Sequence, residues 1–120
     1  MALRCLIVDD NRVFLDSARR LLQRQGLTIV GVASTSAGAL REAEALRPDL
    51  VLVDVSLGED DGFELARRLV TDCGHGATVI LISTRSEGDL ADSVERTPAA
   101  GFLAKSELSA DAIRALLDGG

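Results

Sequence analysis

The sequence has few aromatic residues, few cysteines and no long apolar run. Its only aromatic residues are three Phe, so aliphatic side chains must fill any hydrophobic core. Two distant cysteines, Cys5 and Cys73, exclude a Cys-x-x-Cys metal or redox motif and fit a reducing compartment. No stretch approaches the roughly 20 apolar residues of a membrane helix, so we expect no membrane association. Met1 leads directly into a short apolar run rather than a signal peptide, which predicts a cytoplasmic protein.

Basic residues are also fewer than acidic residues. Thirteen Lys and Arg stand against 19 Asp and Glu, which gives a formal net charge of −6. Nucleic-acid binding depends on clustered Lys and Arg, whereas the basic pairs here, Arg19-Arg20 and Arg67-Arg68, are scattered over expected helix faces. We interpret these pairs as solvated surface and expect no direct contact with nucleic acid. The one histidine, His75, has no acid–base partner near it in sequence, and we assign it no special role.

Five short apolar runs alternate with segments whose apolar residues recur at helical spacing. The runs cover residues 5–8, 27–32, 50–53, 79–82 and 102–104. One of the helical stripes consists of Phe14, Ala18, Leu21 and Leu22. Most runs are continuous rather than alternating, which is typical of strands buried on both faces of a parallel sheet. The fourth expected helix, residues 86–95, has the weakest pattern because it contains many polar residues.

Strands that alternate with helices predict βαβ units and a parallel sheet covered on both faces. Because such crossovers are right-handed, few topologies remain. The pattern fits an α/β flavodoxin-like (βα)5 fold, a doubly wound parallel sheet with strand order 2-1-3-4-5. An apolar content of 47% in 120 residues is enough for one packed core. We therefore expect residues 1–120 to form a single domain.

Polar side chains stand where four of the runs end. Asp9 and Asp10 follow the first run, Asp54 follows the third, Ser83 follows the fourth and Lys105 follows the fifth. The carboxyl ends of parallel strands share one edge of the sheet, and ligands bind there beside the switch point between strands 1 and 3. We therefore expect three carboxylates, a hydroxyl group and an ammonium group in one cleft.

This combination of groups predicts phosphoryl transfer. Three close carboxylates repel one another, which raises at least one pKa unless a cation compensates. Oxygen ligands without Cys or His favour a hard ion, and Mg²⁺ is the usual choice beside phosphate. Mg²⁺ and a lysine can hold the equatorial oxygens of a transferring phosphoryl group, while Asp54 serves as the nucleophile that forms an aspartyl phosphate. Singly, each residue has an ordinary explanation, such as a helix cap for Asp9 and Asp10 or a surface position for Lys105.

The order and separation of these motifs resemble the receiver domain of bacterial two-component systems over essentially the whole chain. The matching segments are residues 6–11, residues 52–54 with Asp61-Gly62, residues 81–83 and residues 100–105. The resemblance implies that Asp54 accepts a phosphoryl group from a sensor histidine kinase or a phosphotransfer protein. It also implies a Mg²⁺ ion that Asp10 binds directly and Asp9 largely through water. Asp54 and the backbone carbonyl of Ser56 would complete the protein ligands.

The resemblance also assigns the roles that turn phosphorylation into a signal. Lys105 would pair with the phosphoryl oxygens, Ser83 would donate a hydrogen bond to one of them, and Phe102 would be the switch aromatic residue. The chain would then be a switch rather than an enzyme, because it catalyses only its own phosphorylation and dephosphorylation. The face formed by the fourth expected helix (residues 86–95), the fifth run (residues 102–104) and the last helical stripe (residues 112–117) would control a downstream protein. The protein would be a monomer or a phosphorylation-dependent dimer.

The sequence departs from the common pattern of that family at three places. Leu57-Gly58 stand where Met-Pro often follows the phosphoacceptor. Ser106 replaces the Pro that often follows the lysine, which removes a candidate cis bond and favours the NarL-like subgroup. Thr84 occupies a position where Ala or Gly is usual, and we expect its bulk to hinder access of the phosphodonor or of water.

Three alternatives remain open. The chain could be the receiver module of a longer DNA-binding response regulator whose output domain is absent. It could be a Mg²⁺-dependent phosphatase that works through an aspartyl phosphate, although such enzymes usually need a second Asp where Ser56 stands. It could be a degenerate receiver that never accepts phosphate, which the complete set of site residues opposes.

Overall fold

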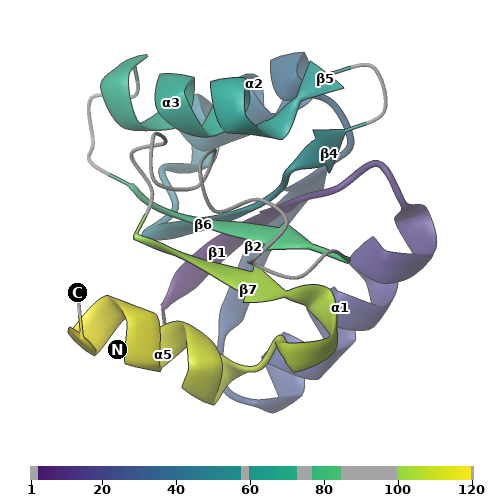
Figure 1. Ribbon diagram of the computed structural model, residues 1–120, viewed down its shortest axis with the longest axis vertical. Helices are drawn as coiled ribbons and strands as arrows, with labels where there is room; N and C mark the ends of the chain where they lie inside the picture. The colour runs from purple at the N-terminus through teal and green to yellow at the C-terminus, as the bar shows by residue number, and fades with distance from the viewer. Residues whose placement is uncertain (1–2, 58–59, 73–76, 85–99, 120) are drawn as a thin grey trace.

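The computed structural model describes residues 3–57, 60–72, 77–84 and 100–119, and a parallel five-stranded sheet lies at its centre (Figure 1). Its strands are β1 (Arg4–Val8), β2 (Thr28–Ala33), β3 (Leu50–Asp54), β6 (Thr78–Ser83) and β7 (Gly101–Ala104). They lie in the order β2-β1-β3-β6-β7, and each neighbouring pair is parallel. This is the predicted order 2-1-3-4-5, so the predicted flavodoxin-like topology is confirmed.

Helices cover both faces of the sheet (Figure 1). They are α1 (Arg12–Arg24), α2 (Ser36–Leu46), α3 (Gly62–Asp72) and α5 (Ala110–Gly119), with a short 3₁₀ helix, η2 (Lys105–Glu107). Helices α2 and α3 lie on one face, and α1 and α5 lie on the other. The predicted helix at residues 86–95, Cys73 and His75 fall outside the described residues. Within the described ranges, every helix is too short or too polar to serve as a transmembrane span.

The continuous apolar runs are explained by two cores, one on each face of the sheet. Along a strand, successive side chains point to opposite faces. Leu6 and Val8 of β1 therefore pack on the α2 and α3 side, whereas Cys5 and Ile7 pack on the α1 and α5 side. Burial raises the pKa of the Cys5 thiol to about 12, so this thiol stays protonated at neutral pH and fills space in the core.

Side-chain caps begin the helices directly after the strand ends. The Asn11 side chain accepts hydrogen bonds from the backbone N–H groups of Val13 and Phe14, at 3.0 and 3.2 Å, and so starts α1. The Asp61 carboxylate accepts a hydrogen bond from Phe63 N at 2.9 Å and so starts α3. Such caps satisfy backbone donors that have no partner within the helix. The turns that start these helices also fix the residues at the carboxyl edge of the sheet.

A small antiparallel hairpin follows β3, in a segment where the sequence analysis identifies neither an apolar run nor a helical stripe. It consists of β4 (Ser56–Leu57) and β5 (Asp60–Asp61), with Ser56 opposite Asp61 and Leu57 opposite Asp60. Leu57 is buried in the core on the α2 and α3 side, which anchors the hairpin. The Asp60 carboxylate accepts a hydrogen bond from Ser36 N at 2.9 Å and so ties the hairpin to the start of α2.

Candidate functional site

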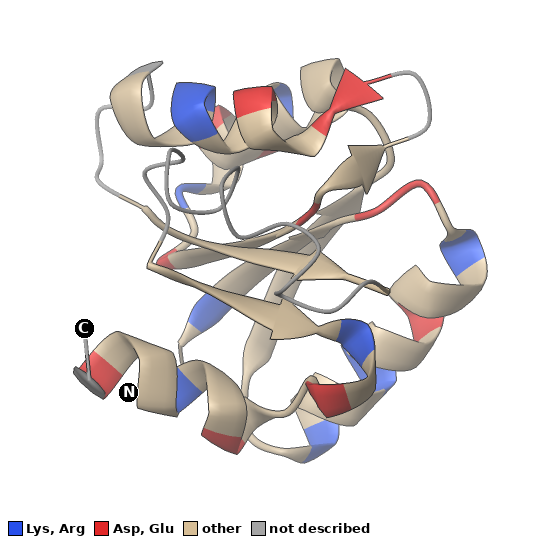
Figure 2. Cartoon of the chain, viewed as in Figure 1, with Lys and Arg blue, Asp and Glu red and all other residues tan. Residues whose placement is uncertain are grey.

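Three carboxylates lie together at the carboxyl edge of the sheet. Asp9 and Asp10 directly follow β1, and Asp54 is the last residue of the neighbouring strand β3 (Figure 2). One oxygen of each residue lies within 4.8 Å of the others. Asp9 and Asp54 are buried, with 0% and 5% of their surface exposed, whereas Asp10 is exposed. Two members of the cluster are therefore buried, and the third faces solvent.

The two buried carboxylates are oriented by the backbone that follows them. Asp9 Oδ1 accepts a hydrogen bond from Asn11 N at 2.8 Å, and Asp54 Oδ1 accepts one from Ser56 N at 3.1 Å. Each of these bonds leaves the second oxygen, Oδ2, directed to the rest of the site. These two oxygens meet the ammonium group of Lys105.

Lys105 compensates both buried carboxylates. Its Nζ donates a hydrogen bond to Asp54 Oδ2 at 3.3 Å and forms a close ion pair with Asp9 Oδ2. Asp9 Oδ2 is buried and accepts no hydrogen bond from the described residues, so this ion pair compensates its charge. Only 13% of the Lys105 side chain is exposed, and within the described residues its ammonium group is the one cation that forms ion pairs with the carboxylate cluster.

Burial raises the pKa of Asp54 above its ordinary value. Loss of solvation on burial is the largest cause, and the Asp9 charge adds to it. The hydrogen bond from Ser56 N and the charge of Lys105 act in the opposite direction. A raised pKa means that the folded protein holds this proton more tightly than the unfolded chain. The stability of the metal-free protein should therefore fall as the pH rises from the ordinary Asp pKa through the raised one.

The remaining predicted site residues lie at or near the same edge. Ser83 ends β6, is 3% exposed, and stands opposite Ala104 in β7, directly before Lys105. Thr84 follows it and is exposed. Phe102 is half-buried in β7 and packs against the core on the α2 and α3 side. The structure thus places Ser83 on the strand between β3, which ends in Asp54, and β7, which directly precedes Lys105.

Phe14 is a contact of the site that the sequence did not predict. Its ring centroid lies 4.3 Å from Lys105 Nζ. The sequence places Phe14 in the apolar stripe of α1, and its ring does pack partly against the core on the α1 and α5 side. It also belongs to the first turn of α1, four residues after Asp10, and this position next to the carboxyl edge is the signal that could have identified it.

Gly62 allows α3 to start directly against the end of β3. A Cβ atom at this position would overlap the carbonyl oxygen of Asp54 and lie 2.6 Å from Val55 Cα. Gly62 N also donates a hydrogen bond to Val55 O at 3.2 Å. The position therefore requires glycine because of close backbone approach. This approach helps to hold the backbone that carries Asp54.

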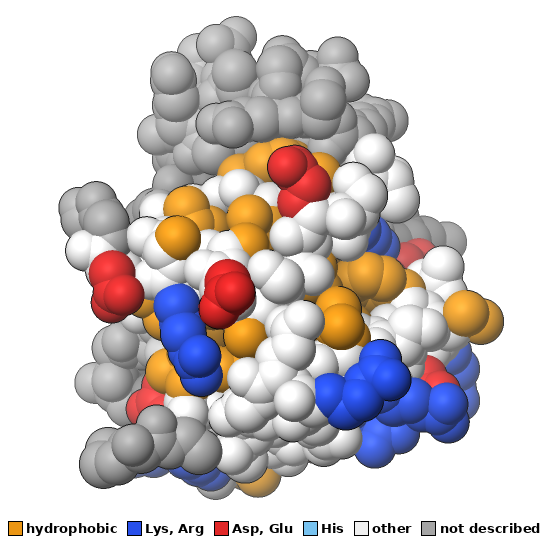
Figure 3. Space-filling model, turned by 90° about the horizontal axis from the view of Figure 1, so that it is seen from below, with side chains coloured by type: hydrophobic (Ala, Val, Ile, Leu, Met, Phe, Trp, Pro, Cys, Tyr) orange, Lys and Arg blue, Asp and Glu red, His pale blue; other side chains and the backbone are white. Residues whose placement is uncertain are grey.

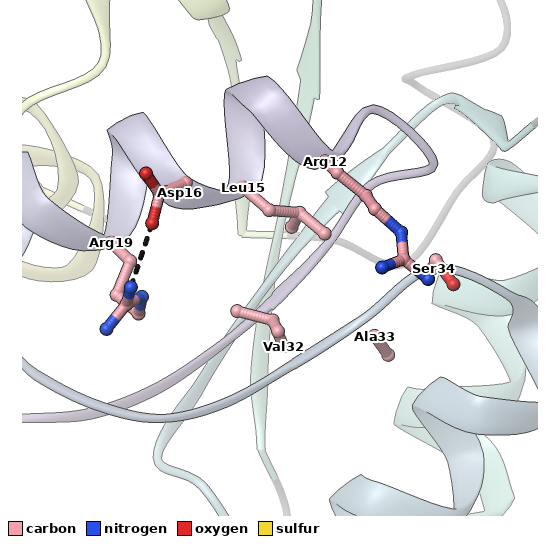
Figure 4. A pocket seen from close by; sticks show the side chains of 7 residues that line it. All are labelled: Arg12, Leu15, Asp16, Arg19, Val32, Ala33 and Ser34. Atoms are coloured by element: carbon pink, nitrogen blue, oxygen red, sulfur yellow. Dashed lines mark hydrogen bonds and ion pairs between the residues drawn. The ribbon is translucent and has the colours of Figure 1, made fainter.

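A separate hollow of about 380 Å³ lies between α1 and the end of β2 (Figure 4). Its lining consists of Arg12, Leu15, Asp16, Arg19, Val32, Ala33 and Ser34. Arg19 is engaged in an ion pair with Asp16 at 2.8 Å. The hollow contains none of the three clustered carboxylates, so we place the reaction at the carboxylate cluster and not in this hollow.

Basic side chains gather over α1 on the face shown in Figure 3. Asp16 forms ion pairs with both Arg19 and Arg20, at 2.8 and 3.3 Å. All three side chains are substantially exposed, so these pairs contribute little to stability. Their arrangement agrees with the interpretation of Arg19-Arg20 as solvated surface.

Known proteins match this chain over a range that includes all of the site residues named above. The sequence model of a family described as the response regulator receiver domain matches residues 5–118. The chain is 29% identical over 112 residues to the response regulator UvrY of Escherichia coli O6:H1, which covers 92% of this chain and 51% of that protein. The chain spans 32% to 51% of the length of three curated relatives that it matches.

Solved structures of response regulators are also similar to this chain. The signal receiver domain of a NarL response regulator from Mycobacterium tuberculosis is 29% identical, with a TM-score of 0.83, and the match covers 98% of this chain and 95% of that one. A response regulator from Burkholderia pseudomallei, solved with a phosphorylated aspartic acid, a calcium ion and citrate, is also 29% identical. That match has a TM-score of 0.81 and covers 96% of this chain and 66% of the other.

Proposed function

Because this chain belongs to the response regulator receiver domain family, we propose that it is a phosphorylation-dependent switch of a two-component system. Receiver domains obtain phosphoryl groups from histidine kinases and act on output partners. Here Asp54 is the acceptor, residues 1–120 form one receiver domain, and the protein works in the cytoplasm. The observation that carries this proposal is the grouping of the Asp9, Asp10 and Asp54 carboxylates beside the Lys105 ammonium group.

The donor atoms of the carboxylate cluster fit Mg²⁺. All are oxygens, three carboxylates contribute within 4.8 Å of one another, and Asp9 Oδ2 is buried with the Lys105 ion pair as its polar partner among the described residues. Such a set selects a hard divalent cation. Asp9, Asp10, Asp54 and the backbone carbonyl of Ser56 would hold the ion. When bound, Mg²⁺ supplies charge neutralisation to the oxygens of the transferring phosphoryl group.

Asp54 is the nucleophile in the proposed reaction. One of its carboxylate oxygens forms a bond to phosphorus while the bond from phosphorus to the donor, a phosphohistidine nitrogen or an acyl-phosphate oxygen, breaks. The electron pair of the broken bond leaves with the donor group. The hydrogen bond from Ser56 N orients the carboxylate. Lys105 lies close enough to Asp54 to pair with the negative charge of the phosphoryl oxygens after the transfer.

The output is a shift between two conformations of the domain. In the phosphorylated form, Ser83 donates a hydrogen bond to a phosphoryl oxygen and draws the end of β6 toward Asp54. Phe102 lies on the adjacent strand and is half-buried, so it can move further inward beside the displaced Ser83. A downstream protein then reads the face that includes β7 and α5. The helix predicted at residues 86–95 lies outside the described residues.

A specific observation favours a longer protein with this domain as its receiver module. The chain spans about half the length of the response regulator UvrY. The length of the intact coding sequence decides between this arrangement and a stand-alone receiver. A phosphatase remains disfavoured because Ser56 occupies the position of the second Asp, and sustained turnover of a phosphorylated small molecule would be needed to support it.

Intact mass spectrometry with acetyl phosphate and Mg²⁺ tests the proposed function. We expect a mass gain of one phosphate that disappears when the metal is chelated. The relative with a phosphorylated aspartic acid and a calcium ion supports this expectation. A protein that gains no phosphate under any metal condition would be a degenerate receiver.

Loss of the Asp10 carboxylate should prevent stabilisation by Mg²⁺. At about five times its Kd, the ion should raise the free energy of unfolding by about 1 kcal/mol, or Tm by roughly 3–6 °C. In Asp10→Asn we expect most of that rise to vanish, because the solvent-facing ligand is gone. Thermal unfolding with MgCl₂ and with EDTA measures the effect. Asp111→Asn, an exposed position on α5, is the matched control and should retain the full rise.

Thr84 should limit access to the phosphoryl group. Its side chain is exposed directly after Ser83. We expect Thr84→Ala to speed phosphorylation, autodephosphorylation or both by about 3- to 10-fold, equivalent to a barrier change of about 1 kcal/mol. Single-turnover rates followed by intact mass measure both steps, and Thr84→Ser should give intermediate values. Unchanged rates in both variants would exclude a steric role for Thr84.

A further inference from the structure

We propose that Phe14 is a positioning residue for Lys105, and that its ring keeps the ammonium group beside Asp54 when a metal ion occupies the carboxylates. The inference rests on the proposed function and extends it to a residue of α1. Phe14 and Lys105 are far apart in the sequence, yet Nζ lies 4.3 Å from the ring centroid. A cation within about 6 Å of an aromatic centroid is attracted by the negative face of the ring.

The ring is fixed by the same turn that orients Asp9. Asn11 N donates a hydrogen bond to Asp9 Oδ1 at 2.8 Å, and the Asn11 side chain accepts one from Phe14 N at 3.2 Å. Phe14 also packs against the core on the α1 and α5 side, which restricts its side chain. The carboxylate and the ring therefore form one preorganised unit around the lysine.

The charges of the site explain why an uncharged group is needed to hold the Lys105 ammonium group in place. Lys105 contacts the Asp9 and Asp54 carboxylates. These two are also proposed ligands of Mg²⁺, so a bound ion competes for the same oxygens and repels the ammonium group. The Phe14 ring attracts a cation without offering a strong ligand to Mg²⁺. It can therefore retain Lys105 near the position where the phosphoryl oxygens arrive.

Ordinary core packing is the competing explanation, and two kinds of substitution separate it from the proposal. Phe14→Leu keeps an apolar side chain but removes the π face, and we expect it to slow phosphorylation by acetyl phosphate about 3- to 10-fold. Phe14→Tyr keeps the ring and should stay within about 2-fold of the original rate. If Leu and Tyr both match the original rate, the ring has no positioning role.

Fluorinated phenylalanines at position 14 give a sharper test, because fluorine weakens the negative face of the ring with little change in shape. We expect the rate to fall stepwise from phenylalanine through the mono-, di- and trifluoro analogues. The same series at Phe63, a half-buried ring on α3, is the matched control and should leave the rate unchanged. A flat series at position 14, combined with a slow Phe14→Leu variant, would assign Phe14 to packing alone.

The Lys105 side-chain NMR signal tests the contact without relying on activity. The ring should shift the ε-methylene protons of Lys105 upfield, and the shift should persist at a Mg²⁺ concentration that saturates the Asp10 amide signal. In Phe14→Leu the upfield shift should be absent. Loss of the shift in the original protein on addition of Mg²⁺ would overturn the positioning role. Phosphate uptake by the original protein in the same samples would then leave the proposed function intact.

Discussion

Replacing Asp54 with asparagine should reduce phosphate uptake from acetyl phosphate by more than roughly 10³-fold, because it removes the nucleophile of the reaction. The amide has nearly the shape of the carboxylate, and its oxygen can still accept the hydrogen bond from Ser56 N. The fold should therefore survive while the chemistry is lost. Intact mass after incubation with acetyl phosphate and Mg²⁺ measures the loss directly.

The matched control for this variant is Asp49→Asn. Asp49 precedes the same strand at its amino end, where its carboxylate accepts a hydrogen bond from Arg4 N at 3.0 Å. This variant should gain one phosphate like the original protein. A mass gain that persists in Asp54→Asn would show that another carboxylate is the acceptor, and the proposed assignment of Asp54 would be wrong.

Asp54→Asn carries a second expectation, which concerns the free energy of unfolding. Burial and the Asp9 charge raise the pKa of Asp54, so the ionised carboxylate destabilises the metal-free fold at neutral pH. Asp54→Asn should therefore be at least as stable as the original protein without metal, and its stability should vary less between pH 4 and 7, about the range from the ordinary Asp pKa upward. Urea unfolding at several pH values measures this difference.

Gly62→Ala should destabilise the protein by about 3 kcal/mol or more. The added Cβ would lie 2.6 Å from Val55 Cα and would also overlap the Asp54 carbonyl oxygen. Both atoms belong to buried backbone, which cannot move aside as a flexible side chain can. The shift needed to accommodate the methyl group would also displace Asp54 from the cluster. Urea unfolding gives the loss of stability, and intact mass gives the accompanying loss of phosphate uptake.

Gly38→Ala provides a contrast at the start of α2. There the nearest atom to an added Cβ is the Thr35 hydroxyl oxygen at 3.0 Å, a side-chain atom that can shift slightly. Alanine is the better helix former, so we expect a net change below about 1 kcal/mol. Equal stability of Gly62→Ala and the original protein would contradict the close packing of α3 against the end of β3.

The sheet and the gathering of polar residues at its edge were predictable from local patterns. Continuous apolar runs indicate strands buried on both faces, and parallel strands bring their carboxyl ends to one edge. Asp10 and Asp54 are close in the structure because β1 and β3 are neighbours in that sheet. Local sequence patterns do not show which of Asp9 and Asp10 is buried, however. Only the three-dimensional structure shows that the first is buried and the second exposed.

Features that depend on packing between distant elements were not predictable. The hairpin of β4 and β5 is too short to have a strand pattern, and its stability depends on burial of Leu57 in the core. The hydrogen bond from Ser36 N to Asp60 joins residues 24 positions apart. The contact of Phe14 with Lys105 depends on where α1 lies relative to the end of β7. Neither composition nor periodicity contains this information.

The central claim is that Asp9, Asp10 and Asp54 surround one site for a hard cation beside the phosphoacceptor. Backbone NMR with traces of Mn²⁺, a paramagnetic ion that also prefers oxygen ligands, tests this geometry most directly. We predict that the amide signals of residues 9–11 and 54–56 broaden first and that excess Mg²⁺ restores them. Broadening that begins at other carboxylates, or signals at both segments that ignore the ion, would contradict the claim.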